Sequence, residues 1–157
     1  MKECEVAAAL KQAGFDNARG EARLLAEHYG GDVPSDAVRR RLRHEPLQYL
    51  LGTWWFYREQ YAVTPDCLIP RADTETLVEQ AVRHLPPDAR FLDLCTGSGC
   101  VAVSTLRARP DTTAVAVDAF EKTLAVAEKE IEKVEKAVLS AGRPARALPV
   151  QHRRRLV

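Results

Sequence analysis

The feature that most constrains the fold is a glycine-rich segment, Cys95-Thr96-Gly97-Ser98-Gly99. It follows a short apolar run, Phe91–Leu94, and precedes a stretch from Val101 onward with helical spacing of apolar residues. A second apolar run, 113–117, ends at Asp118 and leads into an amphipathic segment. The order strand, glycine-rich turn, helix, strand, helix is typical of an open α/β sheet, so we predict an α/β fold.

This turn is also a candidate ligand site. Glycine has no Cβ, so a ligand can approach the backbone, and the start of a helix offers unpaired N–H groups. Asp118 lies 19 residues after Gly99, where a carboxylate can accept both hydroxyls of an adenosine ribose.

Two cofactors fit that pattern. The segment 97–102 matches G-x-G-x-x-A, the dinucleotide fingerprint, but a lone match is weak. Asp93 lies inside the first strand, where dinucleotide folds keep an apolar residue. An acid there suits a ligand with a positive amino group and no pyrophosphate, which favours S-adenosylmethionine over NAD. A tight turn that binds nothing is the third alternative.

The rest of the chain divides into segments of different character. Residues 1–45 show helical periodicity broken by Gly14 and Gly30-Gly31, which predicts a small helical domain. Two aromatic-rich runs inside 46–72 predict a β-hairpin linker followed by a proline-framed loop. Residues 73–141 would form the α/β domain, and 142–157 a basic tail.

Composition excludes several classes of protein. Apolar residues make up 46% and charged residues 29%, a globular balance. No apolar run is long enough to span a membrane, and the first residues do not read as a signal peptide. The cysteines show no spacing for a metal site or a disulfide framework, so we expect no metal and a cytoplasmic setting. Outside the arginine-rich tail there is no clear nucleic-acid site.

Three ordered motifs carry a resemblance to a known family. They are Pro46-Leu47-Gln48-Tyr49-Leu50-Leu51-Gly52, the loop Ile69-Pro70-Arg71-Ala72-Asp73-Thr74-Glu75, and the glycine-rich segment with Asp118. From the residues alone, Asp73 is a candidate N-cap and Glu75 a favourable first-turn acid. Together the motifs resemble the SAM-dependent release factor glutamine methyltransferases, the HemK/PrmC family.

The resemblance implies a helical N-terminal domain, a β-hairpin linker and a Rossmann-like SAM-methyltransferase domain, of which this chain carries the first half. It implies N5-methylation of the glutamine in the Gly-Gly-Gln motif of class 1 peptide chain release factors. The donor would be bound by residues of the glycine-rich segment and the two acids, and the proline-framed loop would lie at the entrance. The first group is Asp93, Cys95, Thr96, Gly97, Ser98, Gly99 and Asp118; the second is Pro70, Arg71, Asp73, Thr74 and Glu75.

Two departures from the family pattern matter. Cys95 stands where the family has glycine, so we expect this position to avoid positive φ. The family's Asn-Pro-Pro-Tyr motif, which holds the substrate amide, does not occur, so we expect a truncated copy of such an enzyme, active or inactive, with no catalytic residue in this chain. A non-catalytic SAM-binding or interaction module and a relative of the adenine-N6 methyltransferases are the alternatives. An unpaired sheet edge would favour self-association.

Overall fold

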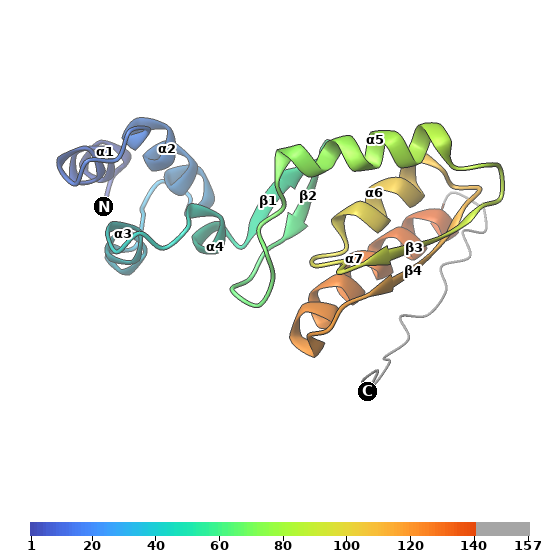
Figure 1. Ribbon diagram of the computed structural model, residues 1–157. Helices are drawn as coiled ribbons and strands as arrows, with labels where there is room; N and C mark the ends of the chain where they lie inside the picture. The colour runs from blue at the N-terminus through green and yellow to red at the C-terminus, as the bar shows by residue number, and fades with distance from the viewer. Residues whose placement is uncertain (141–157) are drawn as a thin grey trace. The chain divides into compact units, whose positions relative to one another are not determined.

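The computed structural model describes residues 1–140, with side chains through Val134. The chain forms two compact units, Met1–Gly52 and a second that begins at Thr53 (Figure 1). The boundary falls inside the segment 46–72 in which we expected a linker. The basic tail expected over 142–157 lies outside the described residues.

The first unit consists of helices. They are α1 (Glu3–Gln12), α2 (Ala18–His28), α3 (Ser35–Leu42) and the short α4 (Leu47–Leu51). The first three follow the predicted periodicity, whereas α4 contains too few residues to show any. Arg41 on α3 pairs with Glu21 on α2 at 2.6 Å and lies 4.2 Å from the centre of the Phe15 ring. Apolar side chains fill the centre of the unit: Val6, Leu10, Ala22, Leu25, Val38 and Leu50.

The second unit opens with the predicted hairpin. Strands β1 (Thr53–Phe56) and β2 (Glu59–Ala62) pair antiparallel, with Phe56 opposite Glu59. The turn has two residues, Tyr57 (φ 45°) and Arg58 (φ 72°). Positive φ at both positions is what a type I′ turn requires, and it is strained for side chains other than glycine.

Two of the helices in the second unit hold this hairpin by polar contacts. The Tyr61 hydroxyl lies 2.7 Å from the Ser104 hydroxyl of α6 (Cys100–Ala108), and both groups are buried. Glu130 of α7 (Glu121–Ser140) is 2% exposed and accepts a hydrogen bond from the Ala62 N–H at 3.1 Å. A buried carboxylate aimed at a strand N–H makes the hairpin part of this unit's core rather than a free linker.

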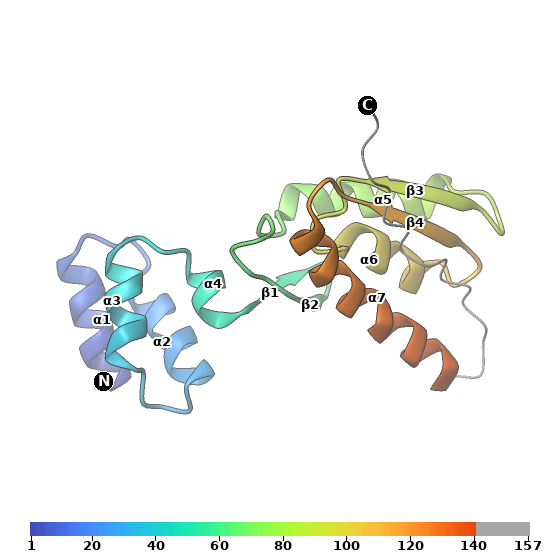
Figure 2. The same cartoon turned by 90° about the horizontal axis from the view of Figure 1, so that it is seen from below.

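The remaining elements confirm the predicted α/β class. They are α5 (Glu75–His84), β3 (Arg90–Leu94), α6, β4 (Thr113–Val117) and α7. β3 and β4 pair in parallel, with Leu92 opposite Val115, and α6 is the crossover between them. Figure 2 shows α6 and α7 on one side of the two strands. The predicted second strand has the bounds found in the structure.

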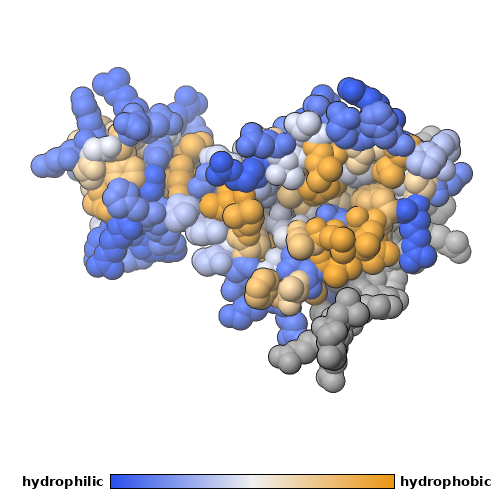
Figure 3. All heavy atoms as spheres, viewed as in Figure 1, coloured by the Kyte–Doolittle hydropathy of each residue, from blue (hydrophilic) through white to orange (hydrophobic). Residues whose placement is uncertain are grey.

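Within the described residues, the other face of this small sheet is uncovered. Leu92 and Leu94 of β3 are 56% and 66% exposed, because successive strand residues point to opposite faces and only one face is covered. Figure 3 shows apolar surface at this place. In the part of the chain that the structure describes, no helix is long and apolar enough to cross a bilayer.

Candidate functional site

The glycine-rich turn lies at the carboxyl end of β3, where ligands bind in open α/β sheets. Three of its residues have positive φ: Cys95 at 59°, Gly97 at 60° and Gly99 at 80°. The Thr96 N–H donates to the Val117 carbonyl at 3.0 Å, which ties the turn to the end of β4. The expectation that Cys95 avoids positive φ is therefore wrong. The chain must reverse within a few residues after β3, and the backbone keeps the left-handed conformation although Cys95 carries a Cβ.

Asp93 supports this turn from inside β3. One of its carboxylate oxygens accepts hydrogen bonds from the Thr96 hydroxyl at 2.7 Å and from the Ala102 N–H at 3.2 Å. The second contact satisfies an N–H in the first turn of α6 that helix geometry leaves unpaired. Burial raises the pKa of Asp93, and the charge of Asp118 adds to that rise. The other carboxylate oxygen makes no hydrogen bond within residues 1–134, so it remains available to a ligand.

Asp118, which directly follows β4, also stabilises this turn. Its carboxylate accepts the Gly97 N–H at 3.0 Å and the Phe120 N–H at 3.1 Å. Sequence spacing gave Asp118 a role in ribose binding only, and did not indicate that its carboxylate also orders the glycine-rich turn. Both acids chosen from the sequence therefore hold the turn in shape.

The two glycines of the turn have different surroundings. A Cβ on Gly99 would lie 3.3 Å from the Cβ of Ala127 in α7, so this glycine permits close packing of the turn against the helix. A Cβ on Gly97 would meet no atom within 4 Å and would occupy open space at the turn. The Ser98 hydroxyl is buried without a hydrogen bond of ordinary geometry in the described residues. Burial raises the pKa of the neighbouring Cys100 thiol to about 11, an effect that Ser98 partly offsets.

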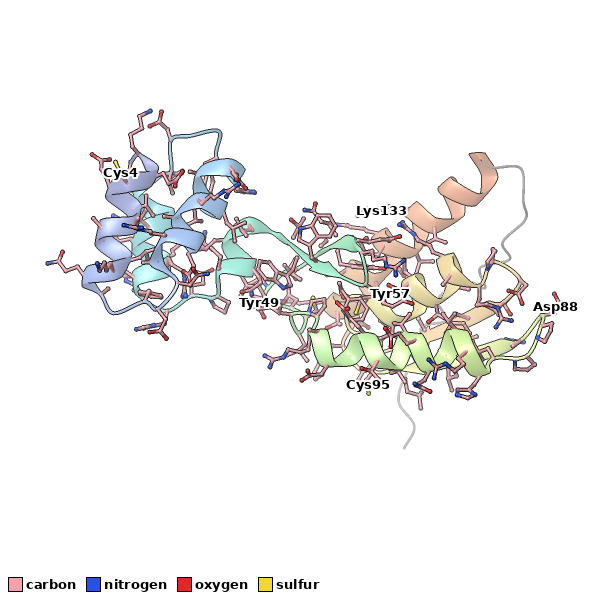
Figure 4. The ribbon with its side chains drawn as sticks, turned by 90° about the horizontal axis from the view of Figure 1, so that it is seen from above. Cys4, Tyr49, Tyr57, Asp88, Cys95 and Lys133 are labelled. Carbon is pink, nitrogen blue, oxygen red and sulfur yellow. The ribbon has the colours of Figure 1, made fainter. Side chains whose placement is uncertain are left out.

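The helix after the proline-framed loop begins differently from the prediction. A single 3-10 turn, Ala72–Thr74, precedes α5, which begins at Glu75 with no side-chain cap. Asp73 is therefore not the N-cap: Thr74 occupies that place in a helical conformation. Glu75 accepts a hydrogen bond from the Tyr57 N–H at 3.1 Å, so its carboxylate contacts the hairpin turn. Figure 4 labels Tyr57 in this turn.

This loop and the glycine-rich turn enclose one pocket of about 220 Å³. Of the predicted site residues, Pro70, Arg71, Thr74, Asp93 and the segment 95–98 line it, whereas Asp73, Glu75, Gly99 and Asp118 do not. The sequence reasoning missed several apolar lining residues. Their side chains carry no signal that separates a pocket wall from a core position: Leu68, Ile69, Leu77, Leu94 and Val101.

The charges in this pocket have a simple arrangement. Among its lining residues, Arg71 supplies a cation from the loop and Asp93 an anion from β3. One cation and one anion in a mostly apolar pocket match a ligand that ends in an ammonium and a carboxylate. A pyrophosphate would instead meet the Asp93 carboxylate, which would repel it. The pocket therefore fits an amino acid end of a ligand better than a dinucleotide.

Comparisons with known proteins agree with these features. The chain is 42% identical over 161 residues to the release factor glutamine methyltransferase of Bordetella pertussis, an alignment that spans 88% of this chain and 60% of that protein. The protein of the same name from Neisseria gonorrhoeae is 42% identical, with 69% of this chain and 47% of that protein covered. For Geobacter sulfurreducens the identity is 44%, with 61% and 34% covered.

Other comparisons add little. No family model matches the chain. A putative protein-L-isoaspartate O-methyltransferase from Plasmodium falciparum, solved with S-adenosyl-L-homocysteine, gives a TM-score of 0.38 at 10% identity, covering 89% of this chain and 59% of that one. A score this low supports no conclusion about fold or ligand.

The sequence relatives decide the family. They share one name and are 35% to 46% identical to this chain, which spans 34% to 60% of the length of the three relatives described above. The chain belongs to the family of the release factor glutamine methyltransferases.

Proposed function

We propose that this chain provides the S-adenosylmethionine-binding part of a release factor glutamine methyltransferase. The observation that carries the proposal is the pocket shared by the glycine-rich turn and the proline-framed loop. Both of its walls come from motifs on which the family resemblance rests. The proposal covers the binding of the methyl donor by residues of this chain, and methyl transfer to a release factor by the family's catalytic unit.

The residues present suit the donor. Asp93 has a free carboxylate oxygen for the ammonium of the methionine end, and Arg71 supplies a cation for its carboxylate. Gly97 leaves open space where any side chain would intrude. Asp118 would turn toward the ribose hydroxyls, which requires it to share or give up its bond to the Gly97 N–H. The donor, once bound, supplies a methyl group activated by its sulfonium.

The acceptor side of the reaction rests on the family alone. The name of these relatives identifies a release factor as their substrate. We propose the same partner for this chain, in the cytoplasm, with the side-chain amide of glutamine as the methylated group. The 157 residues contain no Asn-Pro-Pro-Tyr segment, to which the resemblance assigns the substrate amide, so we assign no catalytic residue here.

Calorimetric titration with S-adenosylmethionine, with NAD as the control ligand, tests donor binding. We expect binding to S-adenosylmethionine alone, and a large loss of affinity in Asp118→Ala. Glu121→Gln is the matched control, since this exposed acid lies three residues further along the chain. Equal binding of NAD, or no heat from either ligand in a folded sample, would refute the proposal.

We also propose that copies of the chain associate through β3. In residues 1–140 this strand pairs with β4 on one edge, and its second edge is unpaired. Leu92 and Leu94 add exposed apolar surface beside that edge. An exposed strand edge next to an apolar face favours pairing with another chain.

A further inference from the structure

Glu75 makes a contact that neither a helix cap nor a catalytic role explains. It is the first residue of α5, and its carboxylate accepts the N–H of Tyr57 at 3.1 Å, from an element 18 residues earlier in the chain. Thr74, the residue immediately before it, lines the donor pocket. The contact therefore joins the end of the pocket wall to the hairpin turn.

The hairpin turn needs such a partner. Tyr57 and Arg58 both adopt positive φ without being glycine, a conformation that is strained for L-amino acids. In a two-residue hairpin turn the N–H of the first central residue is not paired within the hairpin ladder, whose innermost pair here is Phe56 and Glu59. The Glu75 carboxylate satisfies that N–H, and a charged acceptor makes a stronger hydrogen bond than a neutral one.

The loop before Glu75 is also fixed at its other end. The Thr123 hydroxyl of α7 donates to the Asp66 carbonyl at 2.6 Å. Between these two points lie Leu68 and Arg71, which are exposed and line the pocket. The position of the pocket wall therefore depends on the two attachments, one at Asp66 and one at Glu75.

We propose that Glu75 is a positioning residue for the donor pocket. Its carboxylate fixes the start of α5, and with it the wall formed by residues 70–74, against the strained turn of the hairpin. The inference rests on the proposed donor site for its functional consequence. It assigns Glu75 no contact with the donor or the substrate.

Amide hydrogen exchange measured by NMR on the full chain tests the attachment itself. In Glu75→Ala we expect the Tyr57 and Thr74 amides to exchange at least about tenfold faster. Glu75→Gln keeps an oxygen that can accept the same bond, so it should retain protection. Glu79→Ala is the matched control, since it removes an exposed acid from the same helix. A circular dichroism melt of each variant establishes that it is folded.

Titration of the same variants with S-adenosylmethionine tests the consequence for the pocket. Loss of one hydrogen bond that positions the wall should weaken binding roughly threefold to tenfold in Glu75→Ala, with Glu75→Gln and Glu79→Ala close to the parent.

The outcomes separate the two proposals. Unchanged exchange at Tyr57 and Thr74 in Glu75→Ala overturns the positioning role, as does faster exchange with unaltered donor affinity. If the parent chain binds no S-adenosylmethionine, the donor proposal fails, while the exchange rates still decide whether Glu75 fixes the wall.

Discussion

Replacing Cys95 by glycine should stabilise the second unit. The residue is held at φ 59°, where a Cβ meets the neighbouring carbonyl oxygen, and its side chain is exposed, so little packing is lost. Removing the backbone strain should raise the free energy of unfolding by roughly 1–2 kcal/mol. The greater conformational freedom of glycine in the unfolded chain should lower it by about 0.5–1 kcal/mol. We expect a net gain of about 0.5–1 kcal/mol in the free energy of unfolding.

Urea unfolding followed by tryptophan fluorescence measures this gain. Both tryptophans, Trp54 and Trp55, lie in the hairpin, so the signal reports on the second unit. With a urea dependence of about 2 kcal/mol per molar, the midpoint should rise by roughly 0.25–0.5 M.

Cys95→Ala is the matched control, because it removes the thiol and keeps the Cβ. At an ordinary backbone position glycine would be the less stable of the two variants. A glycine variant no more stable than the alanine variant would refute a left-handed conformation at this position.

Three further predictions follow from other contacts. Glu130→Ala should destabilise the second unit by about 1–3 kcal/mol in the same urea assay, because the Ala62 N–H loses its buried acceptor, whereas Glu132→Ala, which removes an exposed acid from the same helix, should have little effect. The hydrogen bond from Arg109 lowers the pKa of Asp111 to about 2. The ionised Asp111 therefore stabilises the fold above about pH 4, and this stabilisation is lost as the pH falls toward 2. Asp111→Asn should reduce the dependence of stability on pH in that range, and an unchanged pH profile would argue against the pairing. Leu94→Lys should shift the chain toward monomer in sedimentation velocity if copies associate through β3, and identical profiles for variant and parent would exclude that interface.

Much of the α/β unit could be predicted from the sequence. Glycines between an apolar strand and a helix indicate a turn from local sequence alone. Both strands and the α6 crossover therefore lie where the pattern predicts. The hairpin could be recognised from its aromatic runs. Its turn could not, because Tyr57 and Arg58 are not typical turn residues, and the Glu75 carboxylate that accepts the Tyr57 N–H comes from a segment 18 residues further along the chain.

The errors near the site have a common physical cause. Asp73 is a residue type that often caps helices, yet a 3-10 turn directly precedes α5, and no residue in an extended conformation caps the helix. Cys95 has a Cβ, yet hydrogen bonds from Thr96 and Gly97 to β4 and Asp118 determine the path of the turn. Near both places a hydrogen bond joins segments that are distant in the sequence, at Glu75 to the hairpin turn and at Thr96 and Gly97 to the end of β4, and sequence spacing does not reveal such contacts.

The most direct test of the account is NMR chemical-shift mapping of the full 157-residue chain during titration with S-adenosylmethionine. If the donor binds in this pocket, the amides of the glycine-rich turn, 95–102, and of the loop, 71–74, show saturable shifts, and the helices of Met1–Gly52 are unaffected. Shifts confined to other parts of the chain, or none at all, would contradict the assignment of this pocket as the methyl-donor site.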